Sequence, residues 1–301
     1  MDRLLAMRVF VRVVEAGTFT RAAGSLNLPR PTVTKLVQGL ESHLRVKLLQ
    51  RTTRRVSVTS EGATYYERAV RWLGELDDFE AGMANAQASP QGRLRVEVGG
   101  SVARLILLPA LPAFHDRHPG IQVDLMVSDR TADLVGDNID CVLRLGPLAD
   151  QSLVARQLGE LSFVTCAAPS YLVRWGRPSH PSQLEAGHQV VNYASHRTGR
   201  LLPLLFAKRG KRVEVQGRHV VTVNESNAHL AAALAGLGII QTPHFMARSH
   251  LDSGELEPVL GDWSPDPQVL YIVYPSNRHL SARLRVFVDW LVALFAGGRY
   301  R

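Results

Sequence analysis

The first 44 residues carry a pattern that few folds satisfy: a helix, a short second helix, a tight turn and a third helix. Residues 2–16 place apolar side chains at helical spacing, and Gly17 follows as a residue able to end a helix. Thr20 is positioned to cap the short second helix, and Asn27 is a turn residue because Asn tolerates positive φ. This order of elements predicts a helix-turn-helix.

The third helix is predicted over residues 28–44, "LPRPTVTKLVQGLESHL", and its two faces differ in chemistry. Pro31 suits the first turn, where a missing N–H costs nothing. The apolar face follows the helical period: Val33, Leu36, Val37, Leu40 and Leu44. The opposite face carries hydroxyls, an amide and cations, with no carboxylate before Glu41: Arg30, Thr32, Thr34, Lys35 and Gln38.

That polar face favours contact with DNA. In a helix-turn-helix the second helix of the pair enters the major groove with its N-terminal residues against base edges. A helix N-terminus also attracts phosphate through its free N–H groups. We therefore predict DNA contacts from Thr20, from Pro31 and from the polar face; the alternative is a solvated helix surface.

A basic ribbon is predicted next, in "VKLLQRTTRRVSVT" at residues 46–59. Alternation at Val56 and Val58 indicates a strand, and the turn before it is rich in arginine. Such a ribbon can lie along the DNA backbone or the minor groove, with contacts expected from Arg51, Thr53, Arg54 and Arg55. The alternative is an exposed basic hairpin with no partner.

The charge of the chain supports a polyanionic partner for this segment alone. Its net charge is +8, and residues 1–59 hold eleven Lys and Arg against three Asp and Glu. Residues 60–301 hold twenty-four of each sign and are formally neutral. Because all the excess positive charge lies in the first fifth of the chain, a polyanion is the expected partner of that fifth.

A long amphipathic helix is predicted after Thr59, which is placed to cap it. Its apolar positions step by three or four, much as in a coiled-coil seam: Tyr66, Ala69, Leu73, Leu76, Phe79 and Met83. We expect this helix to pair with a second copy of itself, the alternative being packing on its own domain. The segment "ASPQG" at residues 88–92 ends it and marks a domain boundary.

From Gly92 onward strands alternate with helices, which predicts an α/β domain with parallel sheets and helices on their faces. A short helix is expected over residues 131–137, and an amphipathic helix closes the chain. In such sheets ligands bind beyond the carboxyl ends of the strands, against helix N-termini. The hydroxyl of Ser101 and the amides near it could hold a carboxylate in this way.

Residues 10–62, "FVRVVEAGTFTRAAGSLNLPRPTVTKLVQGLESHLRVKLLQRTTRRVSVTSEG", resemble the winged helix-turn-helix of the LysR-type transcriptional regulators. The resemblance covers the whole segment. The family often has Ser or Gln where Pro29 and Arg30 stand, Ser-Arg in place of Thr34-Lys35, and Gly in place of Arg45.

The rest of the chain resembles the effector domain of the same family, on "P-x-x-x-x-F…R-x-P-x-x-x-x-D" from Pro109 to Asp124, "APSYL" and "AGLGII". The resemblance implies two α/β lobes, similar to a periplasmic binding protein, with an effector cleft between them. The implied domains are the winged helix-turn-helix at 1–59, a linker and dimerisation helix at 60–91 and an effector domain at 92–301. Lobe one would be 92–164 plus 268–301, and lobe two 165–267.

Cleft residues are expected where predicted strands end. They are Ser101, Ser128, Arg130, Gly146, Asn192, Tyr193, Asn224 and Ser226. Each of them could equally be a loop cap. The resemblance also implies a cytoplasmic bacterial regulator that works as a homodimer, or a dimer of dimers forming a homotetramer. Its partners would be double-stranded DNA, a small-molecule effector such as a carboxylate or an aromatic compound, and RNA polymerase.

Other classes of protein find little support. No nucleophile-elbow, phosphate-loop or paired zinc motif occurs, so no catalytic residue, cofactor or metal site is expected. His115 and His118 read as a surface pair, and Cys141 and Cys166 as small core residues with a redox switch as the alternative. No signal peptide or membrane span is expected, which argues against an exported solute-binding protein. An enzyme on the same scaffold would need a nucleophile or a cofactor lysine in the cleft.

Overall fold

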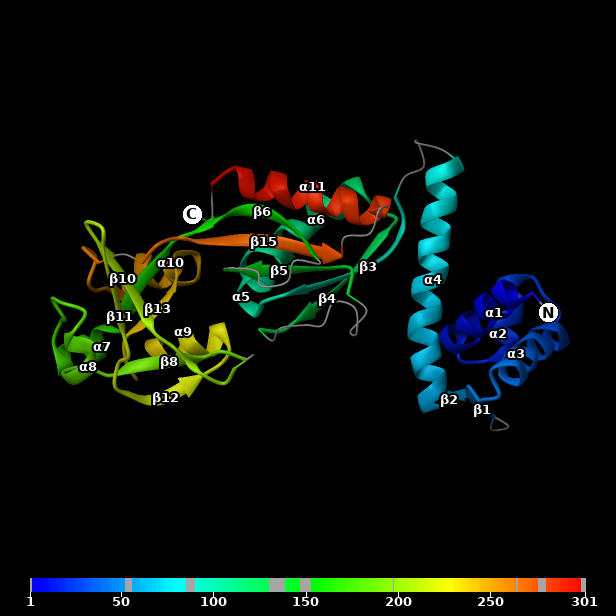
Figure 1. Cartoon of the computed structure of the whole chain (residues 1–301), viewed down its shortest axis with the longest axis horizontal. Helices are drawn as coiled ribbons and strands as arrows, with labels where there is room; N and C mark the ends of the chain where they lie inside the picture. Colours follow the sequence, from blue (N-terminus) through cyan, green and yellow to red (C-terminus); the bar gives the residue numbers. More distant parts are fainter. Residues whose placement is uncertain are drawn as a thin grey trace. The chain divides into compact units, whose positions relative to one another are not determined.

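The computed structural model describes residues 2–51, 56–84, 90–129, 139–146, 153–196, 198–263, 265–275 and 280–298. The chain divides into two compact units, Met1–Ala88 and Ser89–Arg301, drawn in Figure 1. Each unit has a hydrophobic core of its own.

The first unit is a winged helix-turn-helix followed by a long helix. Its elements are α1 (Arg3–Ala16), α2 (Phe19–Leu26), α3 (Arg30–Leu44), β1 (Leu49–Arg51), β2 (Val56–Val58) and α4 (Ser60–Ala84). The two strands pair antiparallel, with Leu49 opposite Val58 and Arg51 opposite Val56. The predicted helix-turn-helix and the predicted ribbon are both confirmed.

Local capping explains where the first two helices end. Gly17 (φ 69°) ends α1 and Asn27 (φ 51°) ends α2, both in the left-handed region that the sequence predicted for them. The prediction for Thr20 as a cap is wrong. Thr18 is the cap of α2, because its backbone is extended (φ −147°) and its hydroxyl accepts from the Arg21 N–H at 3.2 Å. Thr20 lies inside the first turn with an exposed side chain.

The core of the first unit is built where α1, α2 and α3 meet the beginning of α4. Phe10 of α1 is fully buried and meets Tyr65 of α4 edge to face, with ring centroids 5.5 Å apart. Ala69 and Leu73 of α4 are buried in the same core. The apolar positions of α4 therefore serve its own unit over the first half of the helix.

The first lobe of the second unit is a five-stranded sheet in the order β4-β3-β5-β15-β6. Its strands are β3 (Gly92–Val98), β4 (Ile121–Val127), β5 (Cys141–Leu145), β6 (Leu153–Leu161) and β15 (Gln268–Pro275). The helix predicted over 131–137 lies outside the described residues.

The predicted parallel sheet is only half right. β3 pairs parallel with β4 and β5, whereas β15 pairs antiparallel with β5 and β6. A parallel pair needs a crossover connection, and the first strands of the lobe alternate with helices in that way. β15 instead returns from the second lobe, so no crossover helix constrains its direction.

Two helical segments cover one face of this sheet. One runs through α5 (Gly100–Val102), a π-helical turn (Ala103–Leu107) and α6 (Leu108–Arg117), and the other is α11 (Ala282–Ala296), as Figure 1 shows. Phe114 of α6 packs against Phe287 of α11 with ring centroids 5.4 Å apart, and both rings are fully buried. The first of these segments begins at Gly100, two residues after the end of β3. In sheets of this kind ligands bind at the carboxyl ends of the strands.

The second lobe contains three small sheets, in the orders β12-β8-β9, β13-β7-β14 and β10-β11. Its strands are β7 (Phe163–Ala167), β8 (Val190–Ala194), β9 (Leu201–Leu202), β10 (Leu204–Lys208), β11 (Lys211–Val215), β12 (His219–Val223), β13 (Ile240–Pro243) and β14 (Glu257–Pro258). Its helices are α7 (Pro169–Trp175), α8 (Gln183–Ala186), α9 (Ser226–Leu234) and α10 (His244–Asp252).

The chain passes between the lobes twice, once from β6 into β7 and once into β15. β7 begins at Phe163, and Phe163 and Val164 pair with Pro243 and Thr242 of β13. The second lobe thus begins two residues before the predicted boundary at 164/165. Ser162 alone separates β6 from β7, so no break in the sequence marks the crossing.

Candidate DNA-binding and effector sites

The predicted DNA-contacting residues of α3 lie on one exposed face. Pro31, Thr34, Lys35 and Gln38 follow the spacing i, i+3, i+4, i+7 that places residues on one side of a helix. All of the predicted contacts on α3 are exposed except Thr34, which is half-buried. The helix follows Pro29 with no side-chain cap. The Thr32 N–H donates to the Pro29 carbonyl at 2.9 Å and Pro31 has no N–H, so the Arg30 N–H is the helix-start donor left for an external acceptor.

The carboxylate on the inner side of α3 does not reach that face. Glu41 is only 3 % exposed, and its Oε1 accepts from the backbone N–H groups of Leu48 and Leu49 at 3.0 and 3.1 Å. Its Oε2 pairs with the ammonium of Lys47 at 3.3 Å. The exposed face of α3 therefore carries cations and neutral donors, while the negative charge fixes the start of the ribbon.

The ribbon is held from the other side by the start of α4. The hydroxyl of Thr59 caps α4 by accepting from the Gly62 N–H at 2.9 Å, as the sequence predicted, and it donates to the Lys47 carbonyl at 2.7 Å. A Cβ at Gly62 would lie 2.0 Å from the Leu48 carbonyl oxygen, a distance that no side chain tolerates. Only glycine allows this close approach of α4 to the ribbon.

The tip of the ribbon was predicted to contact DNA as well. Arg51 ends β1, whereas Thr53, Arg54 and Arg55 lie outside the described residues. Thr20 is exposed in the first turn of α2, the helix that precedes α3.

The effector domain has a polar cluster where its two lobes meet, centred on Asp129. This residue follows β4, and its Oδ1 accepts from the backbone N–H of Gly100 at 3.0 Å. Its Oδ2 accepts from the hydroxyl of Tyr193 at 3.0 Å and from the backbone N–H of Ser226 at 2.7 Å. Gly100 belongs to the first lobe, and Tyr193 and Ser226 belong to the second, so a single carboxylate connects the lobes.

A second carboxylate completes the start of α9. Glu225 has extended backbone (φ −134°), and its side chain accepts from the N–H groups of Asn227 and Ala228 at 3.0 and 2.8 Å. It also accepts from the Asn227 side chain at 2.7 Å. The backbone N–H of Ser226 is taken by Asp129, so each of the first three N–H groups of α9 has a carboxylate partner.

Tyr193 and His229 face each other in this cluster, edge to face with ring centroids 5.5 Å apart. Burial raises the pKa of Tyr193, and the negative charges of Asp129 and Glu225 raise it further, so the hydroxyl stays protonated and donates. Burial lowers the pKa of His229, whose Nε2 lies 2.8 Å from the Val191 carbonyl. A neutral imidazole that donates to that carbonyl satisfies this geometry.

The structure brings together part of the predicted effector set. Tyr193 and Ser226 share the carboxylate of Asp129, and Ser101 is buried one residue beyond Gly100 in the same helical segment. Ser128 follows β4, and Gly146 (φ 86°) follows β5, at the same carboxyl edge of the sheet. Asn224 lies 3.5 Å from the ring of His196 in the second lobe.

Asn192, a member of the predicted set, does not join the cluster. Asn192 and Tyr193 are neighbours on β8, so their side chains leave opposite faces of the strand. Val190 packs with Tyr171 on the face of Asn192, whereas Val191 packs with α9 on the face of Tyr193. Arg130 lies outside the described residues.

Asp129 and Gly100 were not among the predicted site residues. Asp129 stands between two residues that were predicted, Ser128 and Arg130, at the end of the same strand. A carboxylate directly after a strand is the signal that could have pointed to it. The sequence does not show which groups donate to this carboxylate, because Tyr193 and Ser226 are far from Asp129 in the chain.

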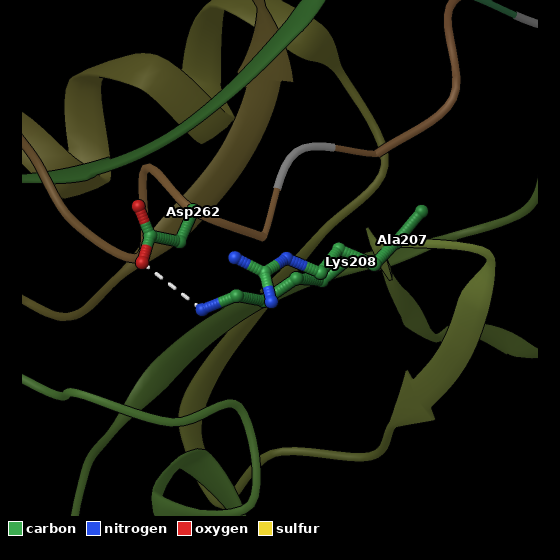
Figure 2. A pocket seen from close by; sticks show the side chains of 4 residues that line it. Ala207, Lys208 and Asp262 are labelled. Atoms are coloured by element: carbon green, nitrogen blue, oxygen red, sulfur yellow. Dashed lines mark hydrogen bonds and ion pairs between the residues drawn. The ribbon is translucent and has the colours of Figure 1, made fainter.

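A separate polar pocket of about 350 Å³ lies at the β10–β11 hairpin, lined by Ala207, Lys208, Arg209 and Asp262. Figure 2 shows the ammonium of Lys208 directed at the carboxylate of Asp262, 3.0 Å away. The hairpin turns at Arg209-Gly210, both with positive φ, which suits a tight two-residue turn. The basic run Lys208 to Arg212 is thus the tip of the β10–β11 hairpin.

Cys141 and Cys166 are buried free thiols, and His115 and His118 pack on an aromatic ring. Burial raises the pKa of Cys166 to about 12 and raises that of Cys141 as well, which suppresses the thiolate that redox chemistry needs. His115 and His118 both contact the ring of Phe114 at the end of α6. Within the described ranges, no three His, Cys, Asp or Glu side chains gather closely enough to hold a metal ion.

A winged helix-turn-helix with a cationic recognition face, joined to a two-lobed α/β domain, defines a DNA-binding regulator that responds to a ligand. The family comparisons agree. Residues 4–63 match the model of the bacterial regulatory helix-turn-helix proteins of the lysR family, and residues 87–296 match the LysR substrate binding domain. The chain belongs to the LysR family of transcriptional regulators, whose members bind DNA and small-molecule effectors, form multimers and are not enzymes.

Curated relatives cover nearly the whole chain. It is 40 % identical to the HTH-type transcriptional regulator YhjC of Escherichia coli (strain K12), over 98 % of each chain. It is 38 % identical to an HTH-type transcriptional repressor of Pseudomonas aeruginosa, over 98 % of this chain and 93 % of the relative. The HTH-type transcriptional activator AaeR of Escherichia coli (strain K12) is 32 % identical over 98 % of this chain and 94 % of its own.

Solved structures show the same architecture. CrgA, a LysR-type transcriptional regulator from Neisseria meningitidis, superposes with a TM-score of 0.61 at 33 % identity, covering 96 % of this chain and 97 % of CrgA. The virulence activator AphB of Vibrio cholerae superposes with a TM-score of 0.60 at 29 % identity, covering 97 % and 99 %. Among the described helices, none has both the length and the apolar character that crossing a lipid bilayer requires.

Proposed function

We propose that this regulator reads double-stranded DNA with the exposed face of α3 and with the basic ribbon, in the bacterial cytoplasm. The observation that carries the proposal is the chemistry of α3: Arg30 and Lys35 are exposed beside neutral donors, while Glu41 is turned inward. Lys35 and Gln38 are placed for base edges, and Arg30 and the uncapped helix start for phosphate. The same proposal assigns residues 1–59 to the DNA-binding domain, 60–91 to the linker and dimerisation helix and 92–301 to the effector domain.

We further propose that the working form is a homodimer, assembled into a dimer of dimers, which pairs through α4. Trp72 and Phe79 are 53 % and 55 % exposed, and Leu76 lies between them at the spacing i, i+4, i+7. Two large aromatic side chains half in water on one helix stripe favour burial against a second copy. Pairing would place two recognition helices in successive major grooves, roughly one turn of DNA apart.

A small-molecule effector would bind between the lobes, near Ser101, Ser128, Gly146, Tyr193, Asn224 and Ser226. Closing the lobes around it would change the spacing of the DNA-binding heads, and with it operator affinity or DNA bending. The coupling must be reciprocal, so DNA changes the affinity for the effector by the same factor. RNA polymerase is the expected partner when the regulator stands at a promoter.

The test of this function is selection of duplexes from a random pool by the full-length chain, followed by footprinting with and without a library of small carboxylates and aromatic compounds. Enrichment of a two-fold symmetric site, and a footprint that one compound alters, is the expected result. Retention of all duplexes in proportion to their length would contradict sequence-specific binding. A library compound turned over by the chain would contradict the effector role.

A further inference from the structure

The carboxylate of Asp129 lies where the two lobes meet and is bound by donors from both of them. Its two oxygens use three donors on three segments: the N–H of Gly100, the N–H of Ser226 and the hydroxyl of Tyr193, all at 2.7–3.0 Å. Two of these donors are N–H groups at helix starts, the groups that bind anions in proteins. The side chain thus provides from within the chain what a bound carboxylate would provide from outside.

No backbone N–H at the start of α9 remains for a second anion. Glu225 takes the N–H groups of Asn227 and Ala228, and Asp129 takes that of Ser226. The next N–H, of His229, bonds to the Glu225 carbonyl at 3.0 Å as the first bond of the helix ladder. A ligand carboxylate here would meet two fixed negative charges and no free backbone donor, so its binding would be opposed.

The backbone around this carboxylate is shaped for close contact between the lobes. A Cβ at Gly99 would lie 3.0 Å from the Asp129 Oδ1, and a Cβ at Gly100 would lie 2.9 Å from the Asn227 Nδ2 and 3.0 Å from the Glu225 Oε1. Side chains at these positions would push the second lobe away or displace the carboxylate. The Gly-Gly pair keeps the first lobe against the start of α9.

We propose that Asp129 is the protein's own anionic ligand: it fills the anion subsite between the lobes, holds the lobes together there and excludes small anionic effectors. The proposal rests on the proposed effector role and narrows the class of effector. A compound that binds beside the carboxylates of Asp129 and Glu225 is neutral or cationic. Donor groups of such an effector can bind the remaining lone pairs of Asp129 and Glu225.

Chemical rescue tests the proposal. In full-length Asp129→Ala the three donors lose their acceptor, and a cavity the size of a small carboxylate opens beside them. We expect a thermal midpoint several degrees below that of the wild type, restored by sodium acetate and not by sodium chloride at equal ionic strength. Wild type and Asp262→Ala, which loses only an exposed ion pair with Lys208, should not respond to acetate.

Three results would overturn the proposal: no restoration of the Asp129→Ala midpoint by acetate, an acetate response of the wild type as large as that of Asp129→Ala, or an Asp129→Ala midpoint equal to that of the wild type. Should the alanine variant fail to fold, Asp129→Asn offers a second test. It keeps the side-chain volume but replaces one accepting oxygen with an NH2 group, which cannot accept from the N–H and O–H donors of the site. Hydrogen exchange, read by mass spectrometry, should then be faster in the peptides covering 99–107 and 224–232. Unchanged exchange in both peptides would refute the proposal that Asp129 holds the two lobes together.

These measurements contain neither DNA nor an effector. A chain that bound no duplex would contradict the proposed function and leave the acetate result standing. If acetate failed to restore the midpoint of Asp129→Ala, the proposal for Asp129 would be contradicted and the proposed DNA binding would still stand.

Discussion

The Oε1 atom of Glu41, on the recognition helix, lies 3.1 Å from the backbone nitrogen of Leu49, where the ribbon begins. The same atom accepts from the Leu48 N–H at 3.0 Å, so one buried carboxylate sets the position of the wing relative to α3. Two elements that are proposed to contact DNA are therefore joined by one buried carboxylate.

Replacing Glu41 by alanine should destabilise the first unit by about 1–3 kcal/mol, because two buried backbone N–H groups lose their acceptor. Urea denaturation followed by circular dichroism measures the change. Glu15→Ala is the control, since Glu15 forms only an exposed pair with Arg12 and should cost little. Equal midpoints for the two variants would show that Glu41 does not hold the ribbon.

Replacing Lys35 by alanine should weaken binding to the selected operator by about 1–3 kcal/mol if its ammonium contacts a base edge. Gel-shift titrations at one fixed salt concentration compare the selected duplex with random duplexes. An equal loss on both would assign Lys35 to phosphate contact. Arg174→Ala, on α7 of the effector domain, is the control for a lost cation and should leave both affinities unchanged.

Replacing Arg45 by glycine should raise stability by about 0.5–1 kcal/mol, because Arg45 ends α3 with φ 55°, a conformation that costs a residue with a Cβ but not glycine. The thermal midpoint of the full-length chain reports the gain. Asn27→Gly is the matched comparison, since Asn tolerates the left-handed region and should change little. A lower midpoint for Arg45→Gly would mean that the guanidinium contributes more than the strain costs.

Replacing Trp72 and Phe79 together by alanine should weaken self-association by about 2–4 kcal/mol, because both rings are hot-spot candidates on the exposed stripe of α4. Sedimentation velocity over a concentration series measures the change in dimer dissociation. Val173→Ala, at a residue 89 % exposed on α7, is the control for removal of surface apolar area. A dimer dissociation constant equal to that of the wild type would show that the dimer does not pair through Trp72 and Phe79.

Both cysteines should resist thiol reagents in the folded chain. The pKa of Cys166 is raised to about 12 and that of Cys141 is raised too, so at pH 8 neither forms appreciable thiolate. Mass spectrometry after iodoacetamide treatment should find both thiols unmodified until urea is added. Rapid modification of either thiol in the native state would revive the redox switch that the sequence left as an alternative.

Local chemistry made the first unit readable from the sequence. The helix ends at Gly17 and Asn27, the cap at Thr59 and the face of α3 all depend on residues within a few positions of one another. Where two nearby threonines can fill one role, sequence is a weaker guide. Thr18 and Thr20 both can cap, and Thr18 does so because its backbone is extended just before the helix begins at Phe19.

The amino-acid sequence by itself determined the cationic head, the recognition helix, the long helix and the alternation of strands with helices, because charge and periodicity are written in neighbouring residues. Tertiary structure alone decided the antiparallel return of β15, the inward turn of Glu41 and the meeting of Asp129 with Tyr193 and Ser226. These contacts join residues far apart in the chain, and a hydrogen bond between such residues exists only after the core has brought them within 3 Å.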